Sequence, residues 1–133
     1  MRTIIAMHER ETAKRGTMHG IRDENLLQSA VQRPIDHYQY AEAPTLLTTT
    51  AALGYGLAKN HAFRDGNKRI SFVATLNFLS LNAGAAVDFK VSEDEIIHTW
   101  RSIADGTLSE DQLAAWLDRN VVLNTSPDQA PRD

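Results

Sequence analysis

Apolar residues recur along much of the chain at the three- and four-residue spacing that is typical of one face of an α-helix. This spacing predicts helices over residues 4–14 and 45–60. A third helix is predicted between them, with Asp23 as its N-cap and Pro34 at its end, because proline disfavours continuation of a helix through the residue before it.

Two more helices are predicted toward the carboxyl end of the chain. Ser92 is followed three residues later by Glu95, and Ser109 by Gln112, so both pairs match the pattern of a capping box. Each of these helices carries an apolar stripe with one tryptophan, and we expect both tryptophans in the core. The pattern therefore predicts an all-α fold.

The segment 67–81 differs from the other helices because apolar residues lie on nearly every side of it. Such a helix is expected to be buried at the centre of the domain. Residues 85–91 alternate in polarity and predict a short extended connector or, less simply, a flap that pairs with a target peptide. We expect one compact helical domain over residues 1–123 and a mobile polar tail over 124–133.

Composition is consistent with one domain, since the chain has 133 residues, 42% of them hydrophobic. It contains neither a membrane-spanning apolar run nor a signal-peptide pattern, so we expect a cytoplasmic protein without a membrane partner. The absence of cysteine excludes disulfides and thiolate chemistry. A net charge of −3 argues against direct binding of nucleic acid.

The candidate chemistry lies in nine residues, HAFRDGNKR, at positions 61–69. Histidine titrates near neutral pH, so His61 is the candidate general base toward an attacking hydroxyl. Asp65 is a hard oxygen ligand that suits Mg²⁺ shared with nucleotide phosphates. Phe63 offers no such chemistry and is expected to anchor the loop in the core.

The second half of this stretch suits an anion. Gly66 lets the backbone approach a ligand closely, and together with Asn67 it begins a helix whose N-terminus would bind phosphate. Lys68 and Arg69 would neutralise charge on a transferring phosphoryl group. Each residue alone is common on protein surfaces, so the prediction depends on their combination in one short segment.

The stretch resembles the signature of the Fic/Doc superfamily, whose Fic branch reads HPFx[D/E]GNGRxxR and whose Doc (death-on-curing) branch reads HxFx[D/N][G/A]NKR. The match is to the Doc branch, because Lys68 stands where Fic proteins have their second glycine and Phe72 where they have the final arginine. Ala62 replaces the usual proline. The segment Gly20 to Pro34 is similar to the GIRDxxLLxxAxxRP stretch of Doc-like proteins.

This resemblance implies a Fic-like helical bundle around a buried central helix. It also implies that lysine at position 68 reverses the nucleotide, so that the γ-phosphate of ATP, with Mg²⁺, is transferred to a Ser or Thr hydroxyl. The implied protein is a toxin of a toxin–antitoxin pair that phosphorylates elongation factor Tu, blocks translation and is restrained by a cognate antitoxin. The catalytic residues would be His61, Lys68 and Arg69.

Two alternatives stay open from the sequence: a Fic-type protein AMP transferase, and a non-enzymatic module that binds an anion or a partner. Five further residues have no assigned role. Tyr38 and Tyr40 are expected to be partly buried at a helix junction, Arg22 to form a structural ion pair, and Lys59 to be an exposed lysine at a helix end, while Arg64 occupies the variable position of the motif.

Overall fold

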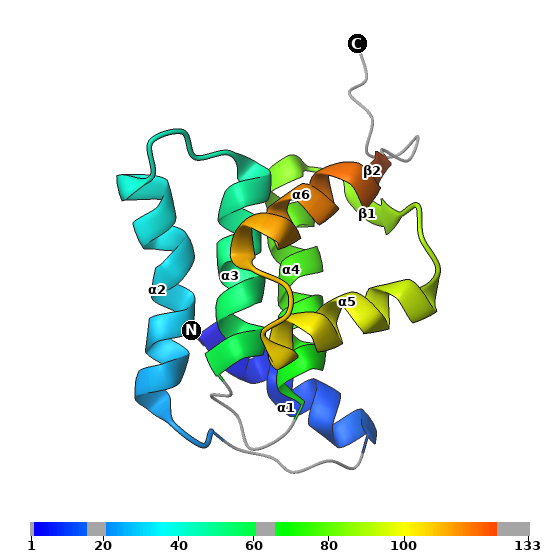
Figure 1. Cartoon of the computed structure of the whole chain (residues 1–133). Helices are drawn as coiled ribbons and strands as arrows, with labels where there is room; N and C mark the ends of the chain where they lie inside the picture. Colours follow the sequence, from blue (N-terminus) through cyan, green and yellow to red (C-terminus); the bar gives the residue numbers. More distant parts are fainter. Residues whose placement is uncertain (1, 16–20, 61–65, 125–133) are drawn as a thin grey trace.

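The computed structural model describes residues 2–15, 21–60 and 66–124 and confirms a helical fold. Six helices and a small two-stranded sheet make up this part of the chain, and the sheet is an addition to the expected all-α class (Figure 1). The elements are α1 Arg2–Arg15, α2 Glu24–Tyr40, α3 Leu46–Asn60, α4 Asn67–Ala83, β1 Ala86–Phe89, α5 Glu93–Asp105, α6 Glu110–Asn120 and β2 Val121–Asn124.

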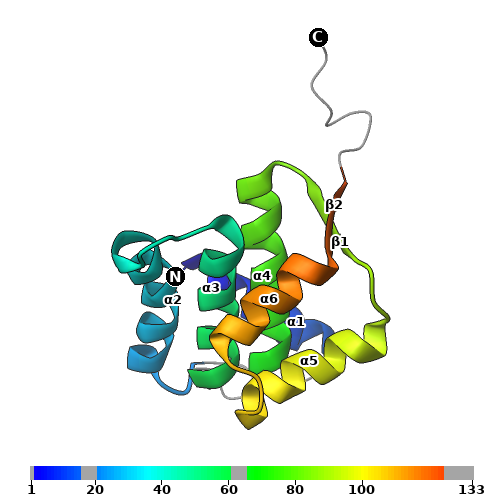
Figure 2. The ribbon, with the colours of Figure 1, turned by 45° about the horizontal axis from the view of Figure 1, so that its top comes forward.

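The central helix is α3, which contacts α2, α4, α5 and α6 (Figures 1 and 2). Residues 49–54 and 56–58 are all buried. The hydrophobic pattern predicted that the helix over residues 67–81 would be the central one, and this choice of helix was wrong. Helix α4 buries one side, including Ile70 and Leu79, whereas Leu81 near its end is 80% exposed.

Two glycines allow the neighbours of α3 to pack closely against it. A Cβ atom at Gly54 would lie 2.5 Å from Oγ1 of Thr75 on α4. A Cβ atom at Gly56 would lie 2.7 Å from Cδ of Arg33 and 3.2 Å from Cα of Ala30, both on α2. Glycine has no Cβ atom and so avoids these clashes. Close packing of α3 against its neighbours therefore explains the Gly-Tyr-Gly sequence at positions 54–56.

Helix α2 begins as predicted but ends later. Asp23 caps it by accepting hydrogen bonds from the backbone N–H groups of Asn25 and Leu26, at 2.9 and 3.1 Å. Pro34 does not end the helix: it is buried within α2, which continues to Tyr40. Packing of the apolar face of α2 against α3 outweighs the backbone hydrogen bond that proline cannot make. The added turn leaves Tyr38 71% exposed and Tyr40 80% exposed, so their expected partial burial was wrong.

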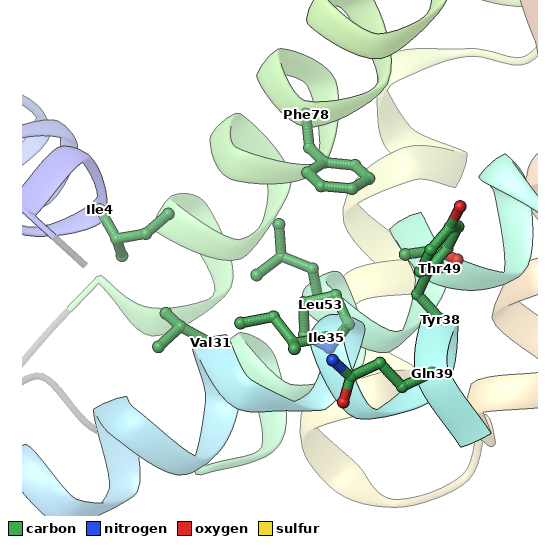
Figure 3. A pocket seen from close by; sticks show the side chains of 9 residues that line it. Ile4, Val31, Ile35, Tyr38, Gln39, Thr49, Leu53 and Phe78 are labelled. Carbon is green, nitrogen blue, oxygen red and sulfur yellow. The ribbon is translucent and has the colours of Figure 1, made fainter. Parts of the chain in front are cut away.

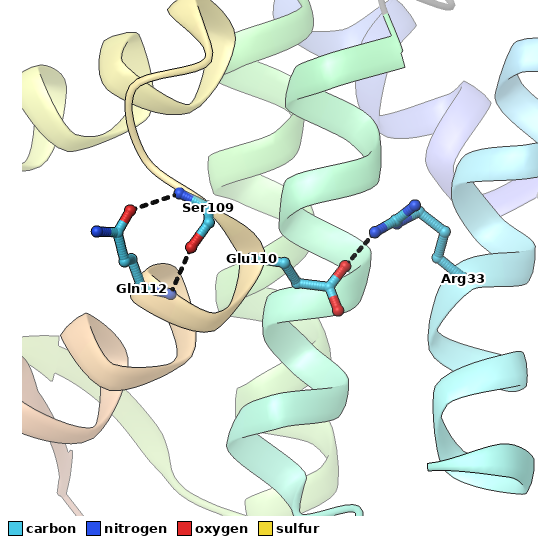
Figure 4. A network of polar contacts seen from close by, with 4 residues as sticks. All are labelled: Arg33, Ser109, Glu110 and Gln112. Atoms are coloured by element: carbon cyan, nitrogen blue, oxygen red, sulfur yellow. Dashed lines mark hydrogen bonds and ion pairs between the residues drawn. The ribbon is translucent and has the colours of Figure 1, made fainter.

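The two predicted caps near the carboxyl end differ in detail, and Figure 4 shows the one at Ser109. Ser109 and Gln112 form a complete capping box, because each side chain bonds the backbone N–H of the other, at 3.1 and 2.8 Å. Ser92 caps α5 by accepting from the N–H of Glu95, and this is half of such a box. Next to the complete box, Glu110 forms an ion pair with Arg33 of α2.

A closed ring of four aromatic side chains joins α4, β1, α5 and α6. Ring centroids are 5.1 Å apart for Phe72 and Trp100, 5.7 Å for Trp100 and Trp116, 5.4 Å for Trp116 and Phe89, and 5.9 Å for Phe89 and Phe72. Both tryptophans are buried, as predicted.

The predicted extended segment is β1, and it has a partner that the sequence did not indicate. Strand β2 pairs with it in antiparallel register, with Ala86 opposite Asn124 and Phe89 opposite Val121. Asn124, which the sequence analysis placed first in the tail, is therefore the last residue of β2. Within the described residues, we find no helix both long enough and apolar enough to cross a membrane.

Candidate functional site

The motif stretch lies between the end of α3 and the start of α4, and its first five residues, 61–65, lie outside the described residues. The predicted base His61, the predicted Mg²⁺ ligand Asp65 and the predicted anchor Phe63 therefore stay predictions. Arg64, which has no assigned role, also lies outside the described residues. The remaining four residues of the stretch, 66–69, are described.

The end of α3 that precedes the motif stretch is fixed by contacts to two other helices. Nδ2 of Asn60 donates a hydrogen bond of 3.1 Å to the backbone carbonyl of Leu26 on α2. Lys59 is half-buried, and its ammonium group lies against Gly106 at the end of α5, 2.8 Å from where a Cβ atom of that glycine would be. Lys59 thus packs on the carboxyl end of α5, where a cation is favoured by the helix dipole.

The first described residue after position 65 is the N-cap of α4. Gly66 occupies this position with φ 75° and ψ 20°, a left-handed conformation that glycine adopts without strain. Helix α4 then starts at Asn67, so the prediction that a helix begins at this point is confirmed. The N-terminus of α4 is the positive end of the helix dipole, and it lies at the motif residues Gly66 and Asn67. This favours binding of an anion at that end of the helix.

A cavity of about 380 Å³ lies between the first turns of α4 and one side of α5, and we call it the cationic cavity. Helix α4 lines it with Lys68, Arg69 and Phe72. Helix α5 lines it with Glu93, Ile96, Ile97, Trp100 and Arg101.

Charge and apolar surface are both present in this cavity. Three cations and one carboxylate line it, a formal net charge of +2 on a chain whose overall charge is −3. Within residues 21–60 and 66–124, none of these three cations forms an ion pair with a carboxylate. The cavity is therefore suited to a ligand that is anionic at one end and apolar at the other.

Buried hydrogen bonds hold the wall of the cavity in place. Nε1 of Trp100 donates to Oγ of Ser71, at 2.9 Å. Oγ of Ser71 in turn donates to the backbone carbonyl of Gly54 on α3, at 2.5 Å. Because these groups are shielded from water, breaking either bond would leave a buried polar group without a partner. The chain of bonds thus fixes α5 relative to α4 and α3.

The described residues alone do not form a metal site. No group of three or more histidine or acidic side chains among them could hold a metal ion. Mg²⁺, however, commonly binds one or two carboxylates and completes its shell with water and substrate phosphates. Glu93 brings one carboxylate to the cationic cavity, and oxygen ligands of this kind are chemically suited to Mg²⁺.

A second cavity of about 430 Å³ lies farther along the bundle, between α1, α2, α3 and α4 (Figure 3). We call it the apolar cavity, because hydrocarbon side chains dominate its lining and no charged side chain contributes to it. It lies near the carboxyl half of α4, away from the motif. Its main apolar lining residues are Ile4, Val31, Ile35, Leu53 and Phe78, with Tyr38 at one side.

Two charged residues of the cationic cavity, Glu93 and Arg101, were not predicted from the sequence. Both lie on α5, far along the chain from the motif, and no short pattern connects them to it. A weak signal was present: Glu93, Ile97 and Arg101 are spaced four residues apart and so share one face of the predicted helix. Arg22, for comparison, is exposed beside the cap of α2.

Comparisons with known proteins agree with the resemblance seen in the motif. Residues 1–79 match the sequence model of the Fic/DOC family. The chain is also similar to Toxin Doc of Mycolicibacterium smegmatis, with 38% identity over 99 residues, which cover 73% of this chain and 75% of that protein.

Proposed function

The chain belongs to the Fic/DOC family, and we propose that it is the toxin of a toxin–antitoxin pair. In this proposal it is a protein kinase that transfers the γ-phosphate of ATP to a Ser or Thr hydroxyl of elongation factor Tu and thereby blocks translation. The toxin role is supported by the similarity to Toxin Doc. The kinase activity is argued from the residues of this chain.

The observation that carries the kinase proposal is the position of Lys68. It lies on the first turn of α4, two residues after the left-handed N-cap Gly66, and lines the cationic cavity together with Arg69. Its long cationic side chain occupies space that a glycine at this position would leave open to a nucleotide. A phosphoryl group at this helix end would therefore meet two cations.

Each motif residue then has a role in the reaction. His61 accepts the proton of the target hydroxyl as its oxygen forms a bond to the γ-phosphorus, and the bond from that phosphorus to the β-phosphate oxygen breaks. Gly66 and Asn67 bind phosphate oxygens at the start of α4. Lys68 and Arg69 stabilise the charge that develops on the transferred group. Mg²⁺, held through Asp65, would neutralise phosphate charge.

The test uses ATP labelled at either the α- or the γ-phosphate, incubated with elongation factor Tu and the full chain. We expect label from the γ position alone, and none with His61→Ala. Label from the α position would overturn the kinase proposal in favour of AMP transfer. An absence of label from both positions would favour an anion- or partner-binding module without transferase activity.

The toxin role has a separate test in cells. We expect expression of the chain alone to arrest bacterial growth, and the His61→Ala variant, produced to the same level, to leave growth unchanged. Co-expression of a cognate antitoxin should restore growth. Normal growth at high levels of the unaltered chain would contradict the toxin role.

A further inference from the structure

Arg101 is a charged residue of the cationic cavity that lies outside the motif. It follows Trp100 on α5, and both side chains line the cavity. Its guanidinium group comes from a different helix than Lys68 and Arg69, so the cavity has cations on two opposite walls. A single ligand between the walls would therefore contact both helices.

The residues that line the cavity carry an excess of positive charge. Three cations line a space of about 380 Å³, and Glu93 is the one carboxylate among the lining residues, so their formal net charge is +2. A ligand with several negative charges can balance this excess. One with a single negative charge would leave cations without a partner, so the cavity favours a polyanion.

The position of Arg101 is also well fixed at its base. The adjacent Trp100 is 3% exposed, bonds Ser71 on α4 and packs edge-on against Phe72 at 87° between the ring planes. These contacts hold the backbone of α5 near Arg101 against α4, next to its first turn. A phosphate contact made from a fixed helix costs less entropy than one made from a loop.

We propose that Arg101 binds the polyphosphate of ATP as a third cation, opposite Lys68 and Arg69. This inference depends on the proposed function, since it assumes a nucleotide in the cavity. The planar guanidinium presents two parallel N–H donors to phosphate oxygens, a geometry that lysine does not reproduce. Arg101 is therefore a binding residue for the phosphates and has no part in recognising the nucleoside.

The experiment measures equilibrium binding of a non-hydrolysable ATP analogue with Mg²⁺, of inorganic tripolyphosphate and of adenosine to the full chain. The variants are Arg101→Gln, Arg101→Lys and the matched control Arg119→Gln, an exposed arginine on α6 outside the cationic cavity. We expect Arg101→Gln to weaken binding of the analogue and of tripolyphosphate about tenfold or more. Adenosine binding should not change, and Arg119→Gln should behave as the unaltered chain.

Arg101→Lys should recover part of the lost affinity, because it restores the charge without the two parallel donors. Urea unfolding of each variant checks that the fold is intact. Equal affinity of Arg101→Gln and the unaltered chain for the analogue would overturn the role of Arg101 and leave the kinase proposal standing. If the unaltered chain binds neither the analogue nor tripolyphosphate, both proposals are wrong, and an acidic protein segment becomes the better candidate for the cavity.

Discussion

The cationic cavity and the apolar cavity have similar volumes, about 380 and 430 Å³, but opposite linings. The first has two cations on the first turn of α4, where the helix dipole adds to their attraction for an anion, and a third cation on α5. The second lies beside the other half of the same helix and has no charged side chain in its lining. The size of a cavity thus says little about its chemistry, and the lining decides which ligand can bind.

Helix α3 connects the two cavities. Leu53 lines the apolar cavity, and the carbonyl of the next residue, Gly54, accepts the hydrogen bond from Ser71 that supports the wall of the cationic cavity. A change in α3 can therefore affect the cationic cavity through packing, whereas a change on the exposed rim of the apolar cavity cannot. The following predictions test this distinction.

The largest effect is expected from Lys68→Gln. Loss of one cation that stabilises the transferring phosphoryl group should slow phosphate transfer about 100- to 1,000-fold, with little change in stability because the side chain is exposed. Transfer of γ-label to elongation factor Tu measures this. The matched control is Lys90→Gln, an exposed lysine that lines neither cavity. Equal rates in the two variants would contradict the assigned role.

Gly54→Ala should lower the free energy of unfolding by about 1–3 kcal/mol. The added methyl group would meet Oγ1 of the buried Thr75 at 2.5 Å, and this overpacking outweighs the gain of about 1 kcal/mol in helix propensity. Urea denaturation measures the change. In a Thr75→Ala background, which removes the clashing oxygen, Gly54→Ala should cost less. An equal cost in both backgrounds would show that the clash is not the cause.

Gly66→Ala and Gly84→Ala form a matched pair at the two ends of α4. Both glycines have a left-handed backbone conformation, with φ of 75° and 66°. Each substitution by alanine should therefore lower the free energy of unfolding by about 1 kcal/mol. Phosphate transfer should fall with Gly66→Ala alone, because Gly84 is remote from the motif. The prediction fails if Gly84→Ala slows transfer to the same extent.

The smallest effect is expected from Tyr38→Ala at the apolar cavity. With 71% of its side chain exposed, its removal should change the free energy of unfolding by less than about 0.5 kcal/mol. The rate of phosphate transfer should stay within about twofold of the unaltered chain, as measured with the same γ-label. A large loss of transfer would mean that the two cavities are coupled in function.

Local signals in the sequence predicted the helices and their starts well. Asp23, Ser92 and Ser109 each cap the helix that follows, because capping depends on a few adjacent residues. Pro34 gave an equally local signal that failed, since packing against α3 decides where α2 ends. Pairing of β1 with β2 was not predicted, because it joins residues far apart in the sequence.

The number of large apolar side chains was a poor guide to the central helix. The buried part of α3 is rich in alanine, glycine and threonine, and small side chains allow neighbours to approach closely. Thr50 is fully buried because its hydroxyl donates to the carbonyl of Leu46 within the same helix, at 2.7 Å. The residues of α3 are buried because their side chains are small or form hydrogen bonds within the helix. Neither property is visible in a pattern of apolar and polar residues.

The candidate site also contains residues that the local sequence predicts and a residue that only the tertiary fold brings into place. Gly66, Lys68 and Arg69 could be predicted because the motif places them in one short segment, and the structure puts them at the start of one helix. Arg101 could not be predicted, since the packing of Trp100 on Ser71 and Phe72 brings α5 beside α4. The motif contains one wall of the cavity, and the tertiary fold supplies the other.

The ring of Phe72, Phe89, Trp100 and Trp116 has a consequence for the order in which a ribosome makes this chain. Trp116 and the strand that pairs with β1 are synthesised long after the motif. A nascent chain that ends before them contains every motif residue, yet it lacks two of the supports that hold the α5 wall. Assembly of the cavity therefore depends on residues up to 124, and a product that ends before Trp116 would carry the motif without these supports.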